Sequence, residues 1–365
     1  MEKIKVLIAD DSAFMRKLIQ EILLTSNRIE ISGTARNGLD AIQKIKKLKP
    51  DVVTMDIEMP VINGIDALKI IMKESPVPVV MLSSTTREGA ENTFLAMQNG
   101  AFDFIAKPSG TISLDLEKIS DEIIEKVLAA SKANLKGLSM IQPRKNLFPT
   151  HFKNSSKIEL DSSNILTQSA TEWEQSAKKL ICIGTSTGGP RALQTVLSKL
   201  PATIKAPILI VQHMPEGFTR SLAIRLNSLS KLTVKEAENG ELLENGTAYI
   251  APGGYHLKIK KMGDRLAVEL DQSELRNGLR PSVDLMFESV SEITGYAKIA
   301  VIMTGMGADG KKGLIQLHQM GKLKAIAESE ETSIVFGMPK AAISTNFIDE
   351  VQNVDDIAGT ILKYV

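Results

Sequence analysis

Residues 181–193, ICIGTSTGGPRAL, combine an apolar run with one serine and several glycines. Two kinds of chemistry fit this pattern. The spacing Gly184-x-Ser186-x-x-Gly189 is one residue away from a dinucleotide-binding fingerprint, which predicts a phosphate cradle. The same letters also fit a G-x-S-x-G turn, which places Ser186 at a strand-to-helix corner as a nucleophile. The segment by itself does not decide between the two.

A serine nucleophile needs a histidine base that a third group orients, and the chain offers candidates for both partners. His213 follows the apolar run APILIVQ, and Asp309 follows AKIAVIMTGMGA. Both are therefore expected at the carboxyl ends of strands, as is Ser186. The other histidines lie in a polar stretch, in a strand pattern and in a helical run: His151, His256 and His318. We predict acyl transfer in which Ser186 attacks, His213 carries the proton and Asp309 orients the imidazole.

The residues around Ser186 favour the nucleophile over the phosphate cradle. Gly188, Gly189 and the helix expected from Pro190 offer backbone N–H groups and a helix dipole to an oxyanion. Pro190 lacks the N–H that a pyrophosphate needs, and no acidic residue ends a strand about 20 residues further on. The order Ser…His…Asp also differs from that of α/β-hydrolases. Cys182 is expected to be a small buried apolar residue.

A second reactive cluster is expected in the first third of the chain. Asp10 and Asp11 end the first predicted strand, and Asp56 ends the third. Carboxylates that converge at one sheet edge repel one another, and Mg²⁺ relieves this repulsion. Ser83 and Lys107 end the fourth and fifth predicted strands. The set predicts an aspartyl phosphate on Asp56, with Mg²⁺ and Lys107 neutralising the phosphoryl oxygens and Ser83 donating to one of them.

The elements that must position the acidic cluster alternate between strand and helix. Strands are predicted near residues 5–10, 29–35, 51–57, 78–84 and 103–108, with amphipathic helices between them and a closing helix over 116–130. This (βα)5 pattern predicts a first domain over residues 1–125 with a parallel sheet covered on both faces.

The alternation resumes in residues 178–365, which we predict as a doubly wound, mostly parallel α/β domain. A β-rich stretch over residues 246–270 predicts hairpins with Gly-rich turns, as an insertion. Residues 126–177 between the domains are rich in Ser, Asn, Lys, Thr and Gln, and we predict a helix end and a flexible linker there. A docking segment around residues 171–175, TEWEQ, is the alternative.

Composition excludes several classes of protein. The 365 residues carry a formal net charge of +1, which does not favour nucleic acid or an anionic membrane as a partner. Aromatic residues make up 4% of the chain, too few for a base-stacking platform. No apolar run approaches the roughly 20 residues of a membrane span, and no signal peptide precedes the first strand. A single cysteine excludes internal disulfides. We expect a cytoplasmic protein.

The N-terminal motifs IADDSAFMRK, VTMDIEMPVINGIDAL and DFIAKPSG resemble the response-regulator receiver domain over residues 1–125. The resemblance implies that a histidine kinase phosphorylates Asp56. It also implies a set of Mg²⁺ ligands, namely Asp10, Asp11, Asp56 and the main-chain carbonyl of Glu58. Ser83 and Phe104 match the positions that switch conformation in that family.

The C-terminal motifs IGTSTGGPRAL, VQHMPEGFTRSLA, NGTAYIAPGGYHL, RPSVDLMF and VIMTGMGADG resemble the catalytic domain of the chemotaxis protein-glutamate methylesterases of CheB type. The resemblance implies the triad Ser186, His213 and Asp309, an oxyanion contact at the Met306 N–H, and Thr187 as a residue lining the site. It implies hydrolysis of glutamate γ-methyl esters on chemoreceptors, with release of methanol, and deamidation of receptor glutamines. The esterase site needs no cofactor.

The two predicted sites lie in domains that a linker joins. This arrangement suggests an esterase whose site the receiver domain covers until Asp56 is phosphorylated. A DNA-binding response regulator is the first alternative, but it needs a small basic output domain. A nucleotide-sensing output domain is the second, and it depends on the phosphate cradle. The kinase, the receptors and the oligomeric state are not determined by the sequence.

Overall fold

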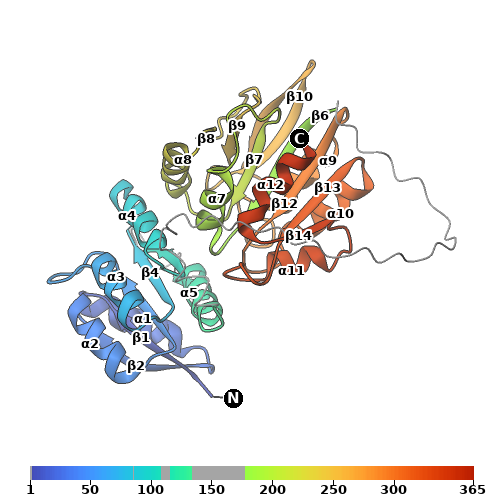
Figure 1. Cartoon of the computed structure of the whole chain (residues 1–365). Coiled ribbons are helices and arrows are strands. Elements are labelled where there is room, and N and C mark those ends of the chain that lie inside the picture. The colour runs from blue at the N-terminus through green and yellow to red at the C-terminus, as the bar shows by residue number, and fades with distance from the viewer. Residues whose placement is uncertain (1, 85, 108–115, 134–176) are drawn as a thin grey trace, which may run out of the picture.

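Each half of the chain is built on a parallel β-sheet with helices packed against it (Figure 1). The computed structural model describes residues 2–84, 86–107, 116–133 and 177–365. Most of the predicted linker, including His151 and the TEWEQ segment, lies outside the described residues. We call residues 2–133 the N-terminal unit and residues 177–365 the C-terminal unit.

The N-terminal unit has a five-stranded parallel sheet in the order β2-β1-β3-β4-β5, which confirms the predicted (βα)5 pattern. Helices α1 and α5 pack on each other, while α2, α3 and α4 follow one another in a second layer. The strands are β1 (Ile4–Ala9), β2 (Ile29–Ala35), β3 (Val52–Asp56), β4 (Val79–Ser83) and β5 (Asp103–Ala106); the helices are α1 (Ala13–Leu24), α2 (Gly38–Leu48), α3 (Gly64–Glu74), α4 (Arg87–Gln98) and α5 (Leu116–Ala130).

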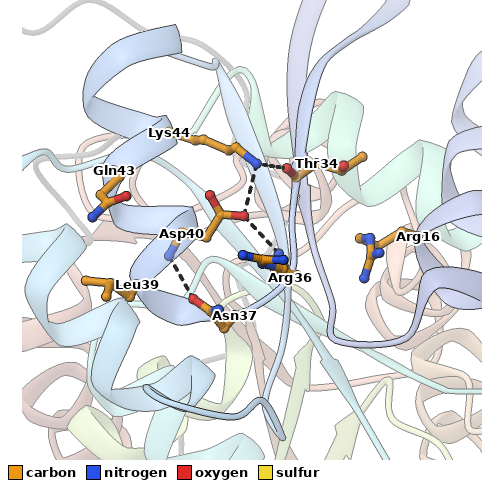
Figure 2. Close-up of a pocket in the computed structure, with 8 residues that line it drawn as sticks. All are labelled: Arg16, Thr34, Arg36, Asn37, Leu39, Asp40, Gln43 and Lys44. Atoms are coloured by element: carbon orange, nitrogen blue, oxygen red, sulfur yellow. Dashed lines mark hydrogen bonds and ion pairs between the residues drawn. The ribbon is translucent and has the colours of Figure 1, made fainter.

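Side-chain caps determine where these helices begin. Asn37 Oδ1 accepts a hydrogen bond from the Asp40 N–H at 2.9 Å and so satisfies a free donor at the start of α2. The Asp40 carboxylate in turn accepts from Lys44 Nζ at 3.0 Å, one helical turn further on (Figure 2). These groups line a hollow of about 450 Å³ beside β2. Asn37, Asp40 and Lys44, which line this hollow, therefore bond to one another and to the start of α2.

The C-terminal unit has a seven-stranded sheet in the order β14-β13-β12-β6-β7-β9-β8, and every neighbouring pair is parallel. Its strands are β6 (Lys178–Thr185), β7 (Ile208–Gln212), β8 (Thr233–Glu236), β9 (Thr247–Ile250), β12 (Tyr296–Ile302), β13 (Leu323–Glu328) and β14 (Glu350–Gln352). Its helices are α7 (Gly189–Leu197), α8 (Phe218–Leu229), α9 (Val283–Ser291), α10 (Lys311–Gln319), α11 (Met338–Ile343) and α12 (Val354–Tyr364).

One antiparallel hairpin, β10 (His256–Met262) with β11 (Arg265–Asp271), confirms the predicted insertion. The prediction of hairpins throughout residues 246–270 was wrong for β9, which joins the main sheet between β7 and β8. All four residues of β9 are buried. A strand buried on both faces is typical of a parallel sheet and lacks the alternation of a half-exposed hairpin.

The strand order reverses at β6. The chain runs from β6 to β7 on one side, and β12 and β13 extend the sheet on the other. Such a switch point opens a crevice at the carboxyl ends of the two central strands, where ligands bind in open α/β sheets. The loops after β6 and β12 meet there. Among the described residues, no helix is long and apolar enough to cross a membrane.

The packing of α9 against α10 and β6 generates a stability prediction. The Phe287 side chain is fully buried, and a Cβ on Gly313 of α10 would come within 2.6 Å of the Phe287 Cβ. Phe287→Ala should therefore lower the free energy of unfolding of the C-terminal unit by about 3–5 kcal/mol, measured by urea denaturation. Ile224→Ala, at a mostly exposed position of α8, should change it by no more than about 0.5 kcal/mol. Equal losses in the two variants would contradict this account.

Candidate active site and phosphorylation site

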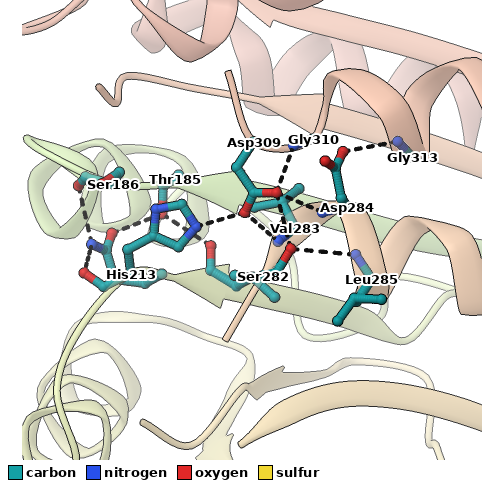
Figure 3. A network of polar contacts seen from close by, with 12 residues as sticks. Thr185, Ser186, His213, Ser282, Val283, Asp284, Leu285, Asp309, Gly310 and Gly313 are labelled. Carbon is teal, nitrogen blue, oxygen red and sulfur yellow. Dashed lines mark hydrogen bonds and ion pairs between the residues drawn. The ribbon is translucent and has the colours of Figure 1, made fainter. Parts of the chain in front are cut away.

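Ser186, His213 and Asp309 lie at the carboxyl edge of neighbouring strands, as predicted (Figure 3). Ser186 follows β6, His213 follows β7, and Asp309 lies in the loop after β12. The parallel pairing of these three strands brings their loops to one edge. The three predicted triad residues therefore share one site.

Asp309 and His213 form a tight pair. His213 Nε2 lies 2.8 Å from Asp309 Oδ2, and both side chains are largely removed from solvent. Burial alone would raise the pKa of the Asp309 carboxyl. The hydrogen bond and charge of His213, together with backbone donors, outweigh burial and lower it. Asp309 is therefore held as a carboxylate that orients the imidazole.

The N-terminus of α9 binds the Asp309 carboxylate through hydrogen bonds. It accepts hydrogen bonds from the Val283 N–H at 2.6 Å, the Asp284 N–H at 3.0 Å and the Ser282 hydroxyl at 3.0 Å (Figure 3). An anion at a helix N-terminus satisfies free N–H groups and gains from the helix dipole. Ser282 was not among the predicted site residues, although a serine followed by Val-Asp and an apolar run is a helix-start signal.

The main chain of Ser186 is held from both sides. Its N–H donates to the Thr304 carbonyl at 3.0 Å, and its carbonyl accepts from Gln212 Nε2 at 3.0 Å. Among the described residues, no hydrogen bond joins the Ser186 hydroxyl to His213 in this arrangement. The turn is therefore fixed while the nucleophilic oxygen remains free to adjust.

The glycines after Ser186 serve close packing. Gly188 has φ of +79°, in the left-handed region, and begins α7. A Cβ on Gly189 would overlap Gln212 Oε1 and crowd Thr185. The Gly189 N–H already donates to the Ser186 carbonyl at 2.7 Å, so it is not free for the oxyanion that the sequence analysis assigned to it.

Met306 offers a better oxyanion donor. It lies beside Ser186 and His213 in the lining of a cleft of about 1010 Å³. Among the described residues, the Met306 N–H makes no hydrogen bond. An unpaired backbone donor at the rim of a cleft can stabilise the charge that develops on a carbonyl oxygen.

Both units line this cleft. Leu128 and Lys132, in and just after α5 of the N-terminal unit, face it together with Ser186, His213 and Met306. The N-terminal unit thus borders the entrance to the candidate catalytic residues.

The two units touch through residues next to both sites. Thr187 Oγ1 donates to Asp103 Oδ2 at 2.7 Å, and both residues are buried. Thr187 was predicted to line the site, and here its hydroxyl faces the N-terminal unit. Phe104, predicted as a switch residue, stacks on Phe218 of α8 with ring centroids 4.9 Å apart. Lys126 pairs with Asp103 at 3.6 Å and steadies that carboxylate.

The acidic cluster of the N-terminal unit forms as predicted. Carboxylate oxygens of Asp10, Asp11 and Asp56 all lie within 4.8 Å of one another. Lys107 Nζ lies 2.8 Å from Asp56 and 3.2 Å from Asp10. Asp10 Oδ2 is buried, and its described contact is the Lys107 ammonium at 3.2 Å, without a well-aligned hydrogen bond. An under-satisfied oxygen among three carboxylates fits a Mg²⁺ site.

Burial raises the pKa of Asp56 to about 6, with the Asp10 charge acting in the same direction, while Lys107 lowers it. The Asp56 carboxylate thus depends on a nearby positive charge.

The two remaining predicted residues of this site are Ser83 and Glu58. Ser83 is buried, donates to the Gly89 carbonyl at 2.9 Å and accepts from Thr93 at 2.7 Å, so its hydroxyl faces α4. The Glu58 N–H donates to Asp56 at 3.3 Å, and the role of the Glu58 carbonyl stays a prediction.

The other candidate groups are structural. His256 is buried with Nε2 at 3.1 Å from the Glu274 carbonyl, and burial lowers its pKa. His318 is exposed and stacks on Phe347. Cys182 is fully buried, as predicted, and burial raises the pKa of its thiol.

Comparison with known proteins agrees with this architecture of a phosphorylation unit joined to a hydrolase unit. Residues 6–117 match the family model of the response regulator receiver domain, and residues 181–361 match that of the CheB methylesterase. Two relatives named protein-glutamate methylesterase/protein-glutamine glutaminase come from Geobacillus kaustophilus and Bacillus subtilis. The first is 53% identical, covering 100% of this chain and 99% of the relative; the second is 49% identical, covering 99% and 98%.

A solved structure also matches. The crystal structure of the Thermotoga maritima CheB methylesterase catalytic domain is 46% identical and superposes with a TM-score of 0.51, covering 52% of this chain and 100% of that one. The chain therefore belongs to the CheB methylesterase family, a family of hydrolases that here carries a receiver domain at its N-terminus.

The capture of Asp309 by α9 can be tested. Ser282 both caps α9 through the Leu285 N–H and donates to Asp309. Ser282→Ala should cost about 1 kcal/mol of unfolding free energy. It should also lower turnover, because Asp309 loses one of the groups that aim it at His213. Ser344→Ala, at the far end of α11, is the control and should leave turnover unchanged. Unchanged turnover in Ser282→Ala would show that the backbone donors alone hold Asp309.

Proposed function

We propose that this protein removes methyl groups from glutamate γ-methyl esters of chemoreceptors, deamidates receptor glutamines, and is activated by phosphorylation. The observation that carries this proposal is the His213–Asp309 pair beside Ser186 in a cleft rimmed by a free Met306 amide. The names of the relatives supply the substrate class. Acting on the cytoplasmic part of receptors requires a cytoplasmic location.

The reaction proceeds in two steps. The Ser186 oxygen attacks the ester carbonyl while His213 takes its proton. Nε2 of His213 is bonded to Asp309, so Nδ1 carries the lone pair that accepts the proton. The oxyanion forms at the Met306 N–H and collapses as His213 protonates the leaving methoxide, which departs as methanol. Water, deprotonated by His213, then cleaves the acyl-serine and yields glutamate. For glutamine the first leaving group is ammonia.

Regulation follows from the contact between the units. We assign residues 1–125 as the regulatory domain, 126–177 as the linker and 178–365 as the catalytic domain. Asp56 accepts a phosphoryl group from a chemotaxis histidine kinase, and Lys107 pairs with the added charge. Asp10, Asp11, Asp56 and the Glu58 carbonyl would hold a Mg²⁺, which would neutralise further charge during phosphoryl transfer. Ser83 then turns from α4 toward the phosphoryl group, Phe104 follows, and the contacts with Phe218 and Thr187 loosen.

The nucleophile assignment predicts that Ser186→Ala abolishes catalysis. Methanol release from a methylated chemoreceptor should fall by at least about 10³-fold, because no other group forms the acyl intermediate. The far-ultraviolet circular dichroism spectrum should not change. Ser198→Ala, at the exposed end of α7, is the control and should keep full activity. Retained hydrolysis in Ser186→Ala would overturn the assignment.

If the hydrogen bond between Thr187 and Asp103 holds the two units together, Asp103→Ala should activate the unphosphorylated protein. A hydrogen bond to a carboxylate contributes about 1.5–3 kcal/mol, so its loss should shift the population toward the open arrangement by about tenfold or more. Methanol release without phosphodonor should rise, while the rate with acetyl phosphate should stay near that of the parent. Asp121→Ala, exposed on α5, serves as control. An unphosphorylated rate no higher than that of the parent would refute a gating role for this contact.

A further inference from the structure

A buried carboxylate lies two strands away from Ser186, outside the predicted triad. Glu328 ends β13 and is 1% exposed. Its Oε2 accepts a hydrogen bond from the Thr304 N–H at 2.7 Å, and its Oε1 accepts from the Thr332 hydroxyl at 2.9 Å. The order β13-β12-β6 places Glu328, Thr304 and Ser186 in a row along the carboxyl edge of the sheet.

Thr304 links Glu328 to the nucleophile turn, residues 185–189. The Thr304 carbonyl accepts from the Ser186 N–H at 3.0 Å. The Thr304 hydroxyl donates to the Thr187 carbonyl at 2.8 Å and accepts from the Val335 N–H at 3.0 Å. Both main-chain groups and the hydroxyl of Thr304 are thus occupied, and two of these bonds go to the turn. A displaced Thr304 must displace Ser186 or break its hydrogen bonds.

The next residue leaves little room for adjustment. A Cβ on Gly305 would lie 2.8 Å from Ser186 Cβ and 3.1 Å from the Ser186 nitrogen, so the two loops approach at backbone distance. Met306, with its free N–H, follows directly. The same loop therefore carries the Thr304 contact and the proposed oxyanion donor.

The buried carboxylate of Glu328 is not explained by a gain in folding stability alone. Burial raises the pKa of Glu328 to about 7, and its hydrogen bonds and the nearby Arg191 only partly offset that effect. A buried charge is a costly acceptor for one backbone N–H. Groups that cost stability yet complete a hydrogen-bond network are found at functional sites.

We infer that Glu328 is a positioning residue of the esterase, which acts through Thr304 to hold the nucleophile turn and the Met306 loop in the geometry of attack. The inference rests on the proposed role of Ser186. Gln212 holds the Ser186 carbonyl from the β7 side, and Glu328 completes the support from the β13 side. The property of Glu328 that matters for this role is a side chain long enough to accept the hydrogen bond from the Thr304 N–H.

Two substitutions separate reach from charge. Glu328→Asp keeps the charge but shortens the side chain by one methylene, whereas Glu328→Gln keeps the reach and an acceptor oxygen but removes the charge. The full chain, activated with acetyl phosphate, is assayed for methanol release from a methylated chemoreceptor fragment. We expect kcat of E328D to fall at least about tenfold with KM within about twofold, because misplacement near 1 Å is that costly. We expect kcat of E328Q to stay within about threefold of the parent.

Two controls run beside these variants. Glu350→Asp shortens a carboxylate on the adjacent strand β14 that binds Lys363 and Tyr364, and it should leave kcat unchanged. Ser186→Ala tests the proposal on which the inference depends. If S186A retains activity, the nucleophile assignment and this inference both fail. If S186A is inactive but E328D turns over like the parent, or E328Q loses as much as E328D, the positioning role of Glu328 alone is overturned.

Discussion

The candidate reactive groups of this protein lie at the carboxyl edges of two buried parallel sheets. Strands covered on both faces are mostly apolar along their length, and the functional side chains of open parallel sheets gather where the strands end. Asp56 and Lys107 stand at such ends in the first sheet, and Ser186 and His213 in the second. The same edge carries Thr304 beside Ser186 and Glu328 one strand further on. The burial of the two sheets therefore confines the candidate catalytic and phosphorylation residues to these edges.

The catalytic edge is held by groups that do not react. Asp309 is fixed by backbone donors at the start of α9, and the Ser186 main chain is fixed between Thr304 and Gln212. These contacts replace water with oriented dipoles before any substrate binds. Among the described residues, the Ser186 hydroxyl and the Met306 N–H make no hydrogen bond, and in the proposed reaction they are the groups that meet the substrate carbonyl.

The contact between the units joins the two sites physically. Asp103 and Phe104 lie on β5, which ends just before Lys107, and their partners lie in and near the catalytic edge: Thr187 next to Ser186, and Phe218 at the start of α8. In the proposed regulation, β5 carries Lys107 at its end and the inter-unit hydrogen bond at its start, so a displacement crosses only a few residues. The proposed regulation thus requires no long path through the fold.

The sequence by itself determined the alternation of strands and helices, the catalytic candidates Ser186, His213 and Asp309, and the acidic cluster of Asp10, Asp11 and Asp56. These follow from local periodicity and from residue types at strand ends, which the chain carries within short segments. It misjudged the glycines after Ser186 and the strand β9, because their surroundings come from Gln212, Thr185 and the neighbouring strands β7 and β8. Only the tertiary structure decided that Ser282 and α9 hold Asp309, that Thr187 meets Asp103, and that Glu328 supports Thr304. Each of these contacts joins residues far apart in the chain, and non-local strand order sets them.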